Sequence, residues 1–182
     1  MLTLVIVIAV AVIAVGVAMY NGLIRSKNQV ENAWSQIDVQ LKRRLDLIPN
    51  LVDTVKGYAA HEQETFQQVI AARNAAIDAP NTPAGQAAPN DTLTGALGKL
   101  FALSEAYPEL KANQNFLALQ EELTATEGRV AYARQFYNDS ILDYNNKIES
   151  VPTVFVAKML GYQQREYFEA DEAARTAPGV GF

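Results

Sequence analysis

The chain has 182 residues, which is enough for one domain with a substantial core but too short for two. Its formal net charge of −5 argues against nucleic acid as a partner, because a phosphate-binding surface must be basic. The absence of cysteine excludes disulfides, thiolate metal sites and thiol chemistry, and it fits a reducing compartment.

An uninterrupted apolar segment opens the chain. Residues 2–19, LTLVIVIAVAVIAVGVAM, contain neither a charge nor a proline. As a helix they extend about 27 Å, close to the roughly 30 Å hydrocarbon core of a bilayer. Tyr20 follows, where an aromatic side chain commonly lies at the membrane interface. We therefore predict a transmembrane anchor over residues 1–20, with Leu2, Val10, Met19 and Tyr20 among its membrane-contacting residues.

A cleaved signal peptide is the alternative interpretation of this segment. Residues 16–18, Gly-Val-Ala, loosely resemble a cleavage site, but only Met1 precedes the apolar stretch and a basic n-region is missing. A retained anchor is therefore favoured. Arg25 and Lys27 follow the span, whereas no basic residue precedes it. The positive-inside tendency then predicts that the N-terminus lies outside and that residues 21–182 lie in the cytoplasm.

A heptad pattern begins after the anchor and predicts a helix that packs one narrow stripe against partner helices. Its members are Val30, Trp34, Ile37, Leu41, Arg44, Ile48, Leu51, Val55 and Tyr58. The register persists past Pro49, which in a helix removes the hydrogen bond to the carbonyl of Leu45. We therefore expect a kink over Leu45–Pro49 instead of a loop. The helix, or a closely stacked pair of helices, is expected to continue through His61 and Phe66 to about Asp78.

The next segment, residues 79–91 (APNTPAGQAAPND), predicts a flexible linker, because it is rich in proline and small residues and has no hydrophobic period. Asp91 and Thr92 offer an N-cap for a following helix. That helix is expected to end near Tyr107-Pro108, because the residue before a proline disfavours the α region. Its apolar face comprises Leu93, Ala96, Leu97, Leu100 and Phe101.

A second long helix is predicted from about Asn113 to Ser150, and Pro152 stops it. Its seam recurs every seven residues, at Phe116, Leu123, Val130, Tyr137, Tyr144 and Val151. Residues 153–182 form a C-terminal tail with a short apolar stretch at 154–160. The fold class is therefore all-α, an N-terminal transmembrane helix continuing into a long antiparallel helical hairpin or bundle over residues 21–152.

Charged residues on or beside the seams are the most informative polar features. Arg44 occupies a seam position of the first helix, and Glu127 and Arg134 lie beside the second seam. A buried charge is costly unless paired, and its best-attested use is to fix register or partner choice. Our hypothesis is that Arg44 pairs with Glu127. In the alternative, Leu45 takes the core position and Arg44 extends from the stripe edge to solvent.

Nothing in the sequence predicts an enzyme active site, a cofactor or a metal. His61 is the one histidine, so neither a zinc site nor a histidine-based triad can be completed around it. Glu121 and Glu122 are adjacent on a helix and point in different directions, as expected of a solvated face. Several asparagines in the helices are expected to bond across helices: Asn21, Asn28, Asn32, Asn50, Asn138, Asn145 and Asn146.

Three strings carry a resemblance to a known family: WSQIDVQL at 34–41, DLIPNLV at 46–52 and FYN at 136–138. With the apolar span before them, they make the chain resemble the LemA family of bacterial membrane proteins over nearly its whole length, the linker at 79–91 excepted. The resemblance implies a helical hairpin or bundle, an N-terminus outside the inner membrane and a cytoplasmic helical domain. It supplies no catalytic residues. A magnetosome membrane protein and proteins encoded near membrane proteases are similar, which indicates membrane organisation.

The leading functional hypothesis is a membrane-tethered scaffold at the cytoplasmic face of the bacterial inner membrane. Besides the lipid bilayer, its expected partners are copies of itself in a homo-oligomer or another membrane protein. The residues expected to carry assembly are Trp34, Ile37, Leu41, Arg44, Pro49, Glu127, Tyr137 and Tyr144. A sensory or regulatory module acting through the Pro49 kink is the alternative from another class. An adaptor for membrane proteolysis rests on the family resemblance alone.

Overall fold

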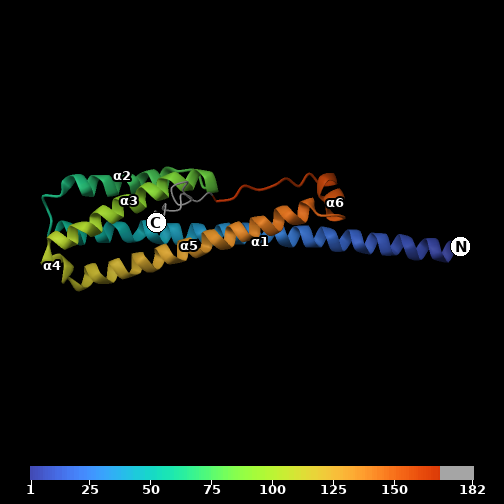
Figure 1. The fold of residues 1–182 in the computed structure, drawn as a ribbon, viewed down its shortest axis with the longest axis horizontal. Coiled ribbons are helices and arrows are strands. Elements are labelled where there is room, and N and C mark those ends of the chain that lie inside the picture. The colour runs from blue at the N-terminus through green and yellow to red at the C-terminus, as the bar shows by residue number, and fades with distance from the viewer. Residues whose placement is uncertain (169–182) are drawn as a thin grey trace, which may run out of the picture. The chain divides into compact units, whose positions relative to one another are not determined.

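The computed structural model describes residues 1–168, which form helices and connecting segments without a strand among them. The predicted all-α class, with a long apolar helix at the N-terminus, is confirmed. The chain divides into two compact units, which are described separately. Unit 1 comprises residues 1–37 and 133–167, and unit 2 comprises residues 38–132 together with Phe168. The helices are α1 (Leu2–Lys56), α2 (Gln63–Asp78), α3 (Pro83–Ala106), α4 (Pro108–Lys111), α5 (Gln114–Glu149) and α6 (Thr153–Met159) (Figure 1).

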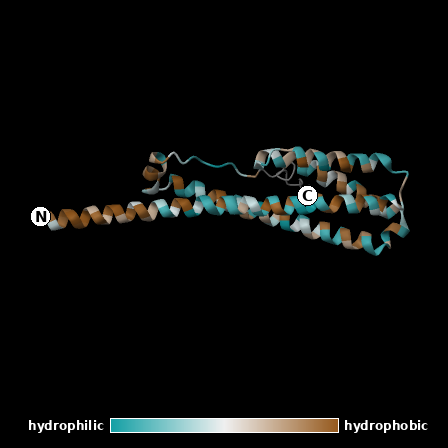
Figure 2. Ribbon diagram, turned by 180° about the vertical axis from the view of Figure 1, so that it is seen from behind, coloured by the Kyte–Doolittle hydropathy of each residue, from teal (hydrophilic) through white to brown (hydrophobic). Residues whose placement is uncertain are grey.

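The first part of α1 packs against nothing else in the described chain. It contains an apolar stretch that is long enough to cross a membrane and of which 0% is buried by protein. Figure 2 shows this stretch as a run of brown, and Leu2 and Val10 are 75% and 59% exposed. Protein packing begins at Leu23, which is fully buried. This apolar helix indicates a membrane protein, in agreement with the predicted anchor.

Unit 2 is a set of helices that run back and forth, so that α2 and α3 lie beside the end of α1 and the start of α5 (Figure 1). Pro49 is exposed inside α1, and the helix continues through it to Lys56 as predicted. A turn over residues 57–62 then separates α1 from α2, so a stacked pair of helices, and not one continuous helix, reaches Asp78. Tyr58 lies in this turn and is 39% exposed, so its assignment to the seam is wrong. The core of unit 2 comprises Ile48, Leu51, Val55, Phe66, Val69, Leu93, Leu97, Leu100, Leu110, Phe116 and Leu123.

The predicted flexible linker over 79–91 is wrong for most of its length, because α3 begins at Pro83. Thr82, not Asp91 or Thr92, is the N-cap, and its hydroxyl accepts a hydrogen bond from the backbone N–H of Gly85 at 3.1 Å. Pro83 at the first helical position is favourable there, since its missing N–H would have no partner. Gly85 is needed beside the cap because a Cβ would lie 2.6 Å from the carbonyl oxygen of Pro80. The predicted end of this helix before Pro108 is confirmed.

The start of α3 was not predicted, because the first residues of its buried stripe are polar. Gln86 and Asn90 are 8% and 1% exposed, and they continue the spacing of the buried leucines that follow. The complete buried stripe comprises Gln86, Asn90, Leu93, Ala96, Leu97, Leu100 and Ser104. At Gln86 and Asn90 the stripe keeps the heptad spacing but consists of amide side chains. A pattern of apolar residues therefore begins only at Leu93.

Unit 1 contains α6, the first part of α1 and the second part of α5. Tyr137, Ile141, Tyr144 and Ile148 of α5 are buried, as the seam predicts. Val151 is 77% exposed, so its place in the seam is wrong, because α5 already ends at Glu149. The apolar stretch at 154–160 forms most of α6, and residues 162–168 continue without helix. The rest of the predicted tail, residues 169–182, lies outside the described residues.

Candidate functional site

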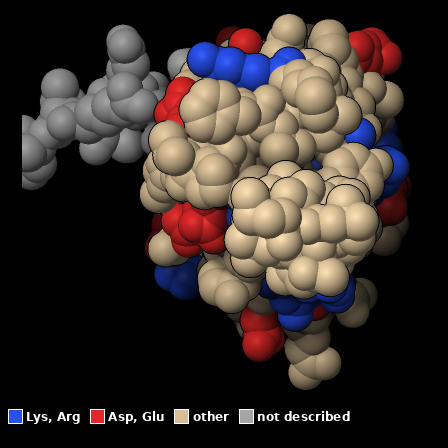
Figure 3. Space-filling view, turned by 90° about the vertical axis from the view of Figure 1, so that its right-hand side faces the viewer, with Lys and Arg blue, Asp and Glu red and all other residues tan. Residues whose placement is uncertain are grey.

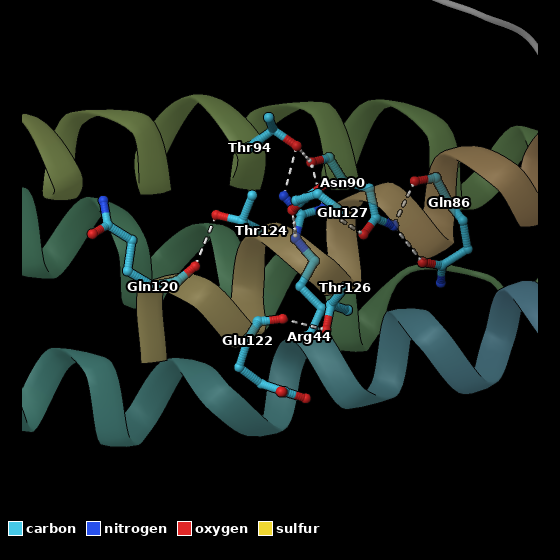
Figure 4. A network of polar contacts seen from close by, with 9 residues as sticks. All are labelled: Arg44, Gln86, Asn90, Thr94, Gln120, Glu122, Thr124, Thr126 and Glu127. Carbon is cyan, nitrogen blue, oxygen red and sulfur yellow. Dashed lines mark hydrogen bonds and ion pairs between the residues drawn. The ribbon is translucent and has the colours of Figure 1, made fainter. Parts of the chain in front are cut away.

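The centre of unit 2 holds a buried guanidinium. Arg44 is 1% exposed, and its Nε lies 2.6 Å from Oε1 of Glu127 on α5 (Figure 4). The predicted pairing of these two residues is therefore confirmed. Leu45 is only partly buried, so the alternative in which it replaces Arg44 in the core is wrong. Glu127 is 38% exposed, so the pair joins a cation that is shielded from water to a carboxylate that water still reaches.

Two residues of α3 complete the surroundings of this cation. The Arg44 Nη2 donates to Oγ1 of Thr94 at 2.6 Å, and Nη1 donates over longer distances, 3.4 Å and 3.5 Å, to the backbone and side-chain oxygens of Asn90. The hydroxyl of Thr94 donates in turn to the backbone carbonyl of Asn90 at 3.0 Å. A buried guanidinium loses hydration worth several hydrogen bonds, so these acceptors offset part of that cost.

The network continues from Asn90 to the end of α2. The Asn90 amide donates to both the carbonyl and the side-chain oxygen of Gln86, each at 2.8 Å. The Gln86 amide donates at 3.3–3.5 Å to the carbonyls of Ala76, Ala79 and Pro80. The last carbonyls of a helix have no partner within it, so Gln86 supplies a donor to the buried carbonyl of Ala76 at the end of α2. Hydrogen bonds and one ion pair thus link α1, α2, α3 and α5 through a single polar network (Figure 4).

The proline in α1 is compensated from outside that helix. Pro49 has no N–H, so the carbonyl of Leu45, four residues earlier, loses its helical partner. The Nε of Arg73 on α2 donates to this carbonyl at 2.9 Å. The contact is partly buried, and it explains how α1 passes through Pro49 without a loop.

An exposed ion pair beside the network provides a contrast. Arg43 and Glu122 form a salt bridge between α1 and α5, but their side chains are 48% and 35% exposed. Exposed pairs contribute about 0–1 kcal/mol, whereas removing one partner of a buried pair costs about 3–5 kcal/mol. Arg44 and Glu127 therefore fix the relative position of α1 and α5 far more strongly than their neighbours do.

The chemistry available around this network is structural. Among the described residues, no group of three His, Asp or Glu side chains could hold a metal ion. His61 is exposed in the turn after α1, and Glu121 is exposed as predicted. A cleft next to Arg73 and Gln86 has a volume of about 260 Å³, below the roughly 300–1,000 Å³ of typical ligand sites. Fixing helix register is a role that buried, paired charges serve in some proteins.

Unit 1 uses its polar seam residues differently, to hold an extended segment that we call the strap, residues 162–167. The hydroxyls of Tyr144 and Tyr137 donate to the carbonyls of Gln163 and Glu166 at 3.1 Å and 3.2 Å. Asn145 makes two bonds with the backbone of Arg165, donating to its carbonyl at 3.0 Å and accepting from its N–H at 2.9 Å. The expectation that some asparagines bond across elements is thus met by Asn145.

Charged and aromatic contacts reinforce the strap. The guanidinium of Arg165 lies 5.6 Å from the ring centre of Tyr144 and 3.3 Å from the carboxylate of Glu31 on α1. Burial raises the pKa of Tyr137. The positive charge of Arg165 opposes this rise, and the negative charge of Glu166 adds to it. Trp34 meets the ring of Tyr137 edge-on, at 5.7 Å between ring centres. Three predicted seam residues thus contribute to this surface. Tyr137 and Tyr144 bond to the strap, and Trp34 packs against the ring of Tyr137.

The predicted site residues divide between the two units. Ile37 belongs to unit 1 and Leu41 to unit 2, and both are ordinary buried seam residues. The sequence did not indicate a role for four further residues of the network: Arg73, Gln86, Asn90 and Thr94. The heptad positions of Gln86 and Asn90 were a usable signal, whereas the partners of Arg73 and Thr94 depend on tertiary packing. A role of any of these residues in assembly stays a prediction.

Comparison with known proteins gives a consistent result. A family model described as "LemA family" matches residues 33–182. Protein LemA of Metamycoplasma hominis is 31% identical over 158 residues, which cover 85% of this chain and 71% of that protein. Magnetosome protein MamQ 2 of Paramagnetospirillum magneticum and magnetosome protein MamQ of Magnetospirillum gryphiswaldense are each 26% identical over 192 aligned residues, covering 92% of this chain and 71% of each relative. None of these names denotes an enzyme.

Proposed function

The chain belongs to the LemA family, and we propose that it is a membrane-anchored helical scaffold that self-associates or docks partner proteins. The observation that carries this proposal is the continuity of α1. One uninterrupted helix, Leu2–Lys56, begins as an apolar stretch without protein contacts and then supplies core residues to both units. A helix that leads from an apolar stretch into a helical core suits a protein that positions others at a membrane.

The interior of unit 2 supports the same proposal. The Arg44 network fixes the register of four helices and leaves no reactive group at its centre. Buried charges are retained in some proteins because they specify one arrangement of helices. Relatives that carry the name magnetosome protein add support for a role in an assembled structure. Molar mass tests the self-association: the detergent-solubilised chain should be larger than one copy, or should co-purify with a defined protein. A strict monomer without a partner would refute the scaffold.

For location, we propose the inner membrane of a bacterial cell with the N-terminus outside and the helical units in the cytoplasm. Arg25 and Lys27 immediately after the apolar stretch support this orientation. Because the chain has no cysteine, single cysteines can be introduced without background labelling. In intact spheroplasts, a membrane-impermeant maleimide should label a cysteine inserted between Met1 and Leu2 and spare Tyr132→Cys until the cells are lysed. The reverse pattern would overturn the orientation.

A regulatory module is the second candidate, and the contact between Arg73 and Leu45 favours it. The helical bond that Pro49 removes from α1 is replaced by a side chain of α2, so a change in α2 would alter the stiffness of α1. If α1 transmits a signal, Pro49→Ala should leave the helical content intact and change the distribution of oligomers or of bound partner. An unchanged distribution would favour the passive scaffold.

A further inference from the structure

The segment that follows α5 exposes large apolar side chains instead of burying them. Phe155 and Met159 of α6 are 70% and 78% exposed, and Val151 just before the helix is 77% exposed. Phe155 and Met159 are four residues apart, so they share one face of α6, whereas Ala157 on the other side is 1% exposed. A short helix that turns phenylalanine and methionine outward and buries alanine has its apolar face directed at something other than its own unit.

Contacts within unit 1 place this segment near the end of the apolar stretch of α1. The Nζ of Lys147, near the end of α5, donates to the carbonyl of Gly22 at 3.2 Å. After α6, the ring of Tyr162 lies 6.5 Å from that of Tyr144. Burial raises the pKa of Tyr162, and Tyr20 and Tyr144 raise it further. Figure 1 shows α6 beside α1 where the N-terminal part of α1 continues alone. The segment is thus level with residues 20–22, where the membrane span ends.

The charges around this position suit the headgroup region of a bilayer. Lys158 is exposed on α6 next to Met159, and basic residues of α1 and α5 surround the end of the span. These residues are Arg25, Lys27 and Lys147. Seen from the N-terminal side, the surface is mainly tan, with Lys and Arg side chains at its edges and Asp and Glu side chains among them (Figure 3). Apolar side chains bordered by basic ones are typical of helices that lie in a membrane interface.

We propose that residues 151–160 form an interfacial membrane helix: Val151, Phe155 and Met159 enter the boundary between headgroups and acyl chains of the bilayer that α1 crosses, and Lys158 contacts the lipid phosphates. This inference rests on the membrane anchoring in the proposed function. A lipid surface is favoured over a protein partner because the segment is continuous with the span within unit 1. The two contacts of the chain with the bilayer, α1 and α6, would hold unit 1 in one orientation against the membrane surface.

Site-directed spin labelling of the full chain in phosphatidylcholine–phosphatidylglycerol vesicles tests the proposal. Four single-cysteine variants carry the nitroxide: Val10→Cys in the span, Phe155→Cys and Met159→Cys on α6, and Tyr132→Cys as a matched control. Tyr132 is 70% exposed, as Phe155 is, but belongs to unit 2. The measurement is the ratio of nitroxide collisions with oxygen, which concentrates in the bilayer, to collisions with a water-soluble nickel complex.

The expected result is a high oxygen-to-nickel ratio at positions 10, 155 and 159 and a low one at 132. If 155 and 159 resemble 132 while 10 remains protected from nickel, the interfacial helix is overturned and the anchor stands. If 10 is also exposed to nickel, the anchoring itself fails, so the two failures are distinguishable. Spin–spin broadening at 155 between copies would identify a second chain as the occupant and would likewise overturn the lipid assignment.

Discussion

The two units place polar side chains on the same heptad seams but satisfy them in different ways. In unit 2, Arg44 is surrounded by side chains from two other helices, α3 and α5, and the carboxylate of Glu127 balances its charge. In unit 1, the hydroxyls of Tyr137 and Tyr144 reach carbonyl oxygens of the strap. The buried contacts of unit 2 are therefore charge and amide contacts between helices. Those of unit 1 are neutral donors bonding to the backbone of an extended segment, and its ion pair between Arg165 and Glu31 is exposed.

This difference predicts how each unit responds to damage. A buried cation without its carboxylate strongly destabilises the folded state, so unit 2 should lose its packing as a whole when that partner is removed. A tyrosine hydroxyl without its acceptor can be rehydrated once the strap moves away, so unit 1 should lose the strap and keep its helices. Hydrogen exchange measured segment by segment in the full chain distinguishes the two responses.

The largest effect should follow removal of the carboxylate in unit 2. Glu127→Ala leaves the guanidinium of Arg44 buried without an opposite charge and should destabilise unit 2 by about 3 kcal/mol. Arg44→Met removes the buried charge and leaves Glu127, which is 38% exposed, in contact with water, so it should cost about 1 kcal/mol or less. Hydrogen exchange of α3 and urea unfolding followed by circular dichroism measure both.

The exposed neighbour supplies the control for this comparison. Glu122→Ala breaks the pair with Arg43, which is 48% exposed, and should change stability by about 0–1 kcal/mol. Equal effects of Glu127→Ala and Glu122→Ala would show that the burial of Arg44 has no energetic consequence, and the contrast between the units would disappear.

A smaller effect is expected from the amide that closes the network. Gln86→Leu keeps the volume of the side chain but leaves the carbonyls of Ala76 and Ala79 without their donor, which should cost about 1–3 kcal/mol. Faster hydrogen exchange should be confined to the end of α2 and the start of α3. Gln67→Leu, at an exposed position of α2, is the matched control and should stay within about 0.5 kcal/mol of the parent.

These networks also show how far sequence reasoning reaches. The pair of Arg44 and Glu127 was predictable, because a charge at a seam position needs an opposite charge on the facing helix. The long apolar helix at the N-terminus was predictable from its composition, and the ends of α2 and α5 were predictable to within a residue or two. Local patterns carry this information.

Partners chosen by tertiary packing could not be predicted. Asn90 and Thr94 lie at or just beyond a segment whose prolines suggested a linker, although Pro83 is in fact at the first helical position. The acceptors of Tyr137 and Tyr144 are backbone carbonyls, which every residue possesses, so no residue type indicates them. The exposure of Phe155 and Met159 on α6 could not be predicted either, because apolar composition does not specify burial.

Pro49 and Arg73 permit a test in which the substitutions should not be additive. Pro49→Ala restores an N–H that can bond to the carbonyl of Leu45, so the donor from Arg73 becomes redundant. Arg73→Met should therefore cost about 1 kcal/mol in the parent chain and less in the Pro49→Ala background. Urea unfolding of the four members of this double-mutant cycle measures the coupling. Strict additivity would mean that the Arg73 contact does not compensate for the proline.

The smallest effect on global stability should come from the strap. Asn145→Ala removes both bonds to the backbone of Arg165 and should cost about 1–2 kcal/mol locally. The strap should then exchange its amides faster and be cleaved sooner by protease after Arg165, while exchange in α1 and α5 stays unchanged. Asn146→Ala, at the exposed neighbouring position, should leave the strap protected. If Asn145→Ala also exposed the helices, the strap would be part of the core of unit 1, and both units would then respond to damage alike.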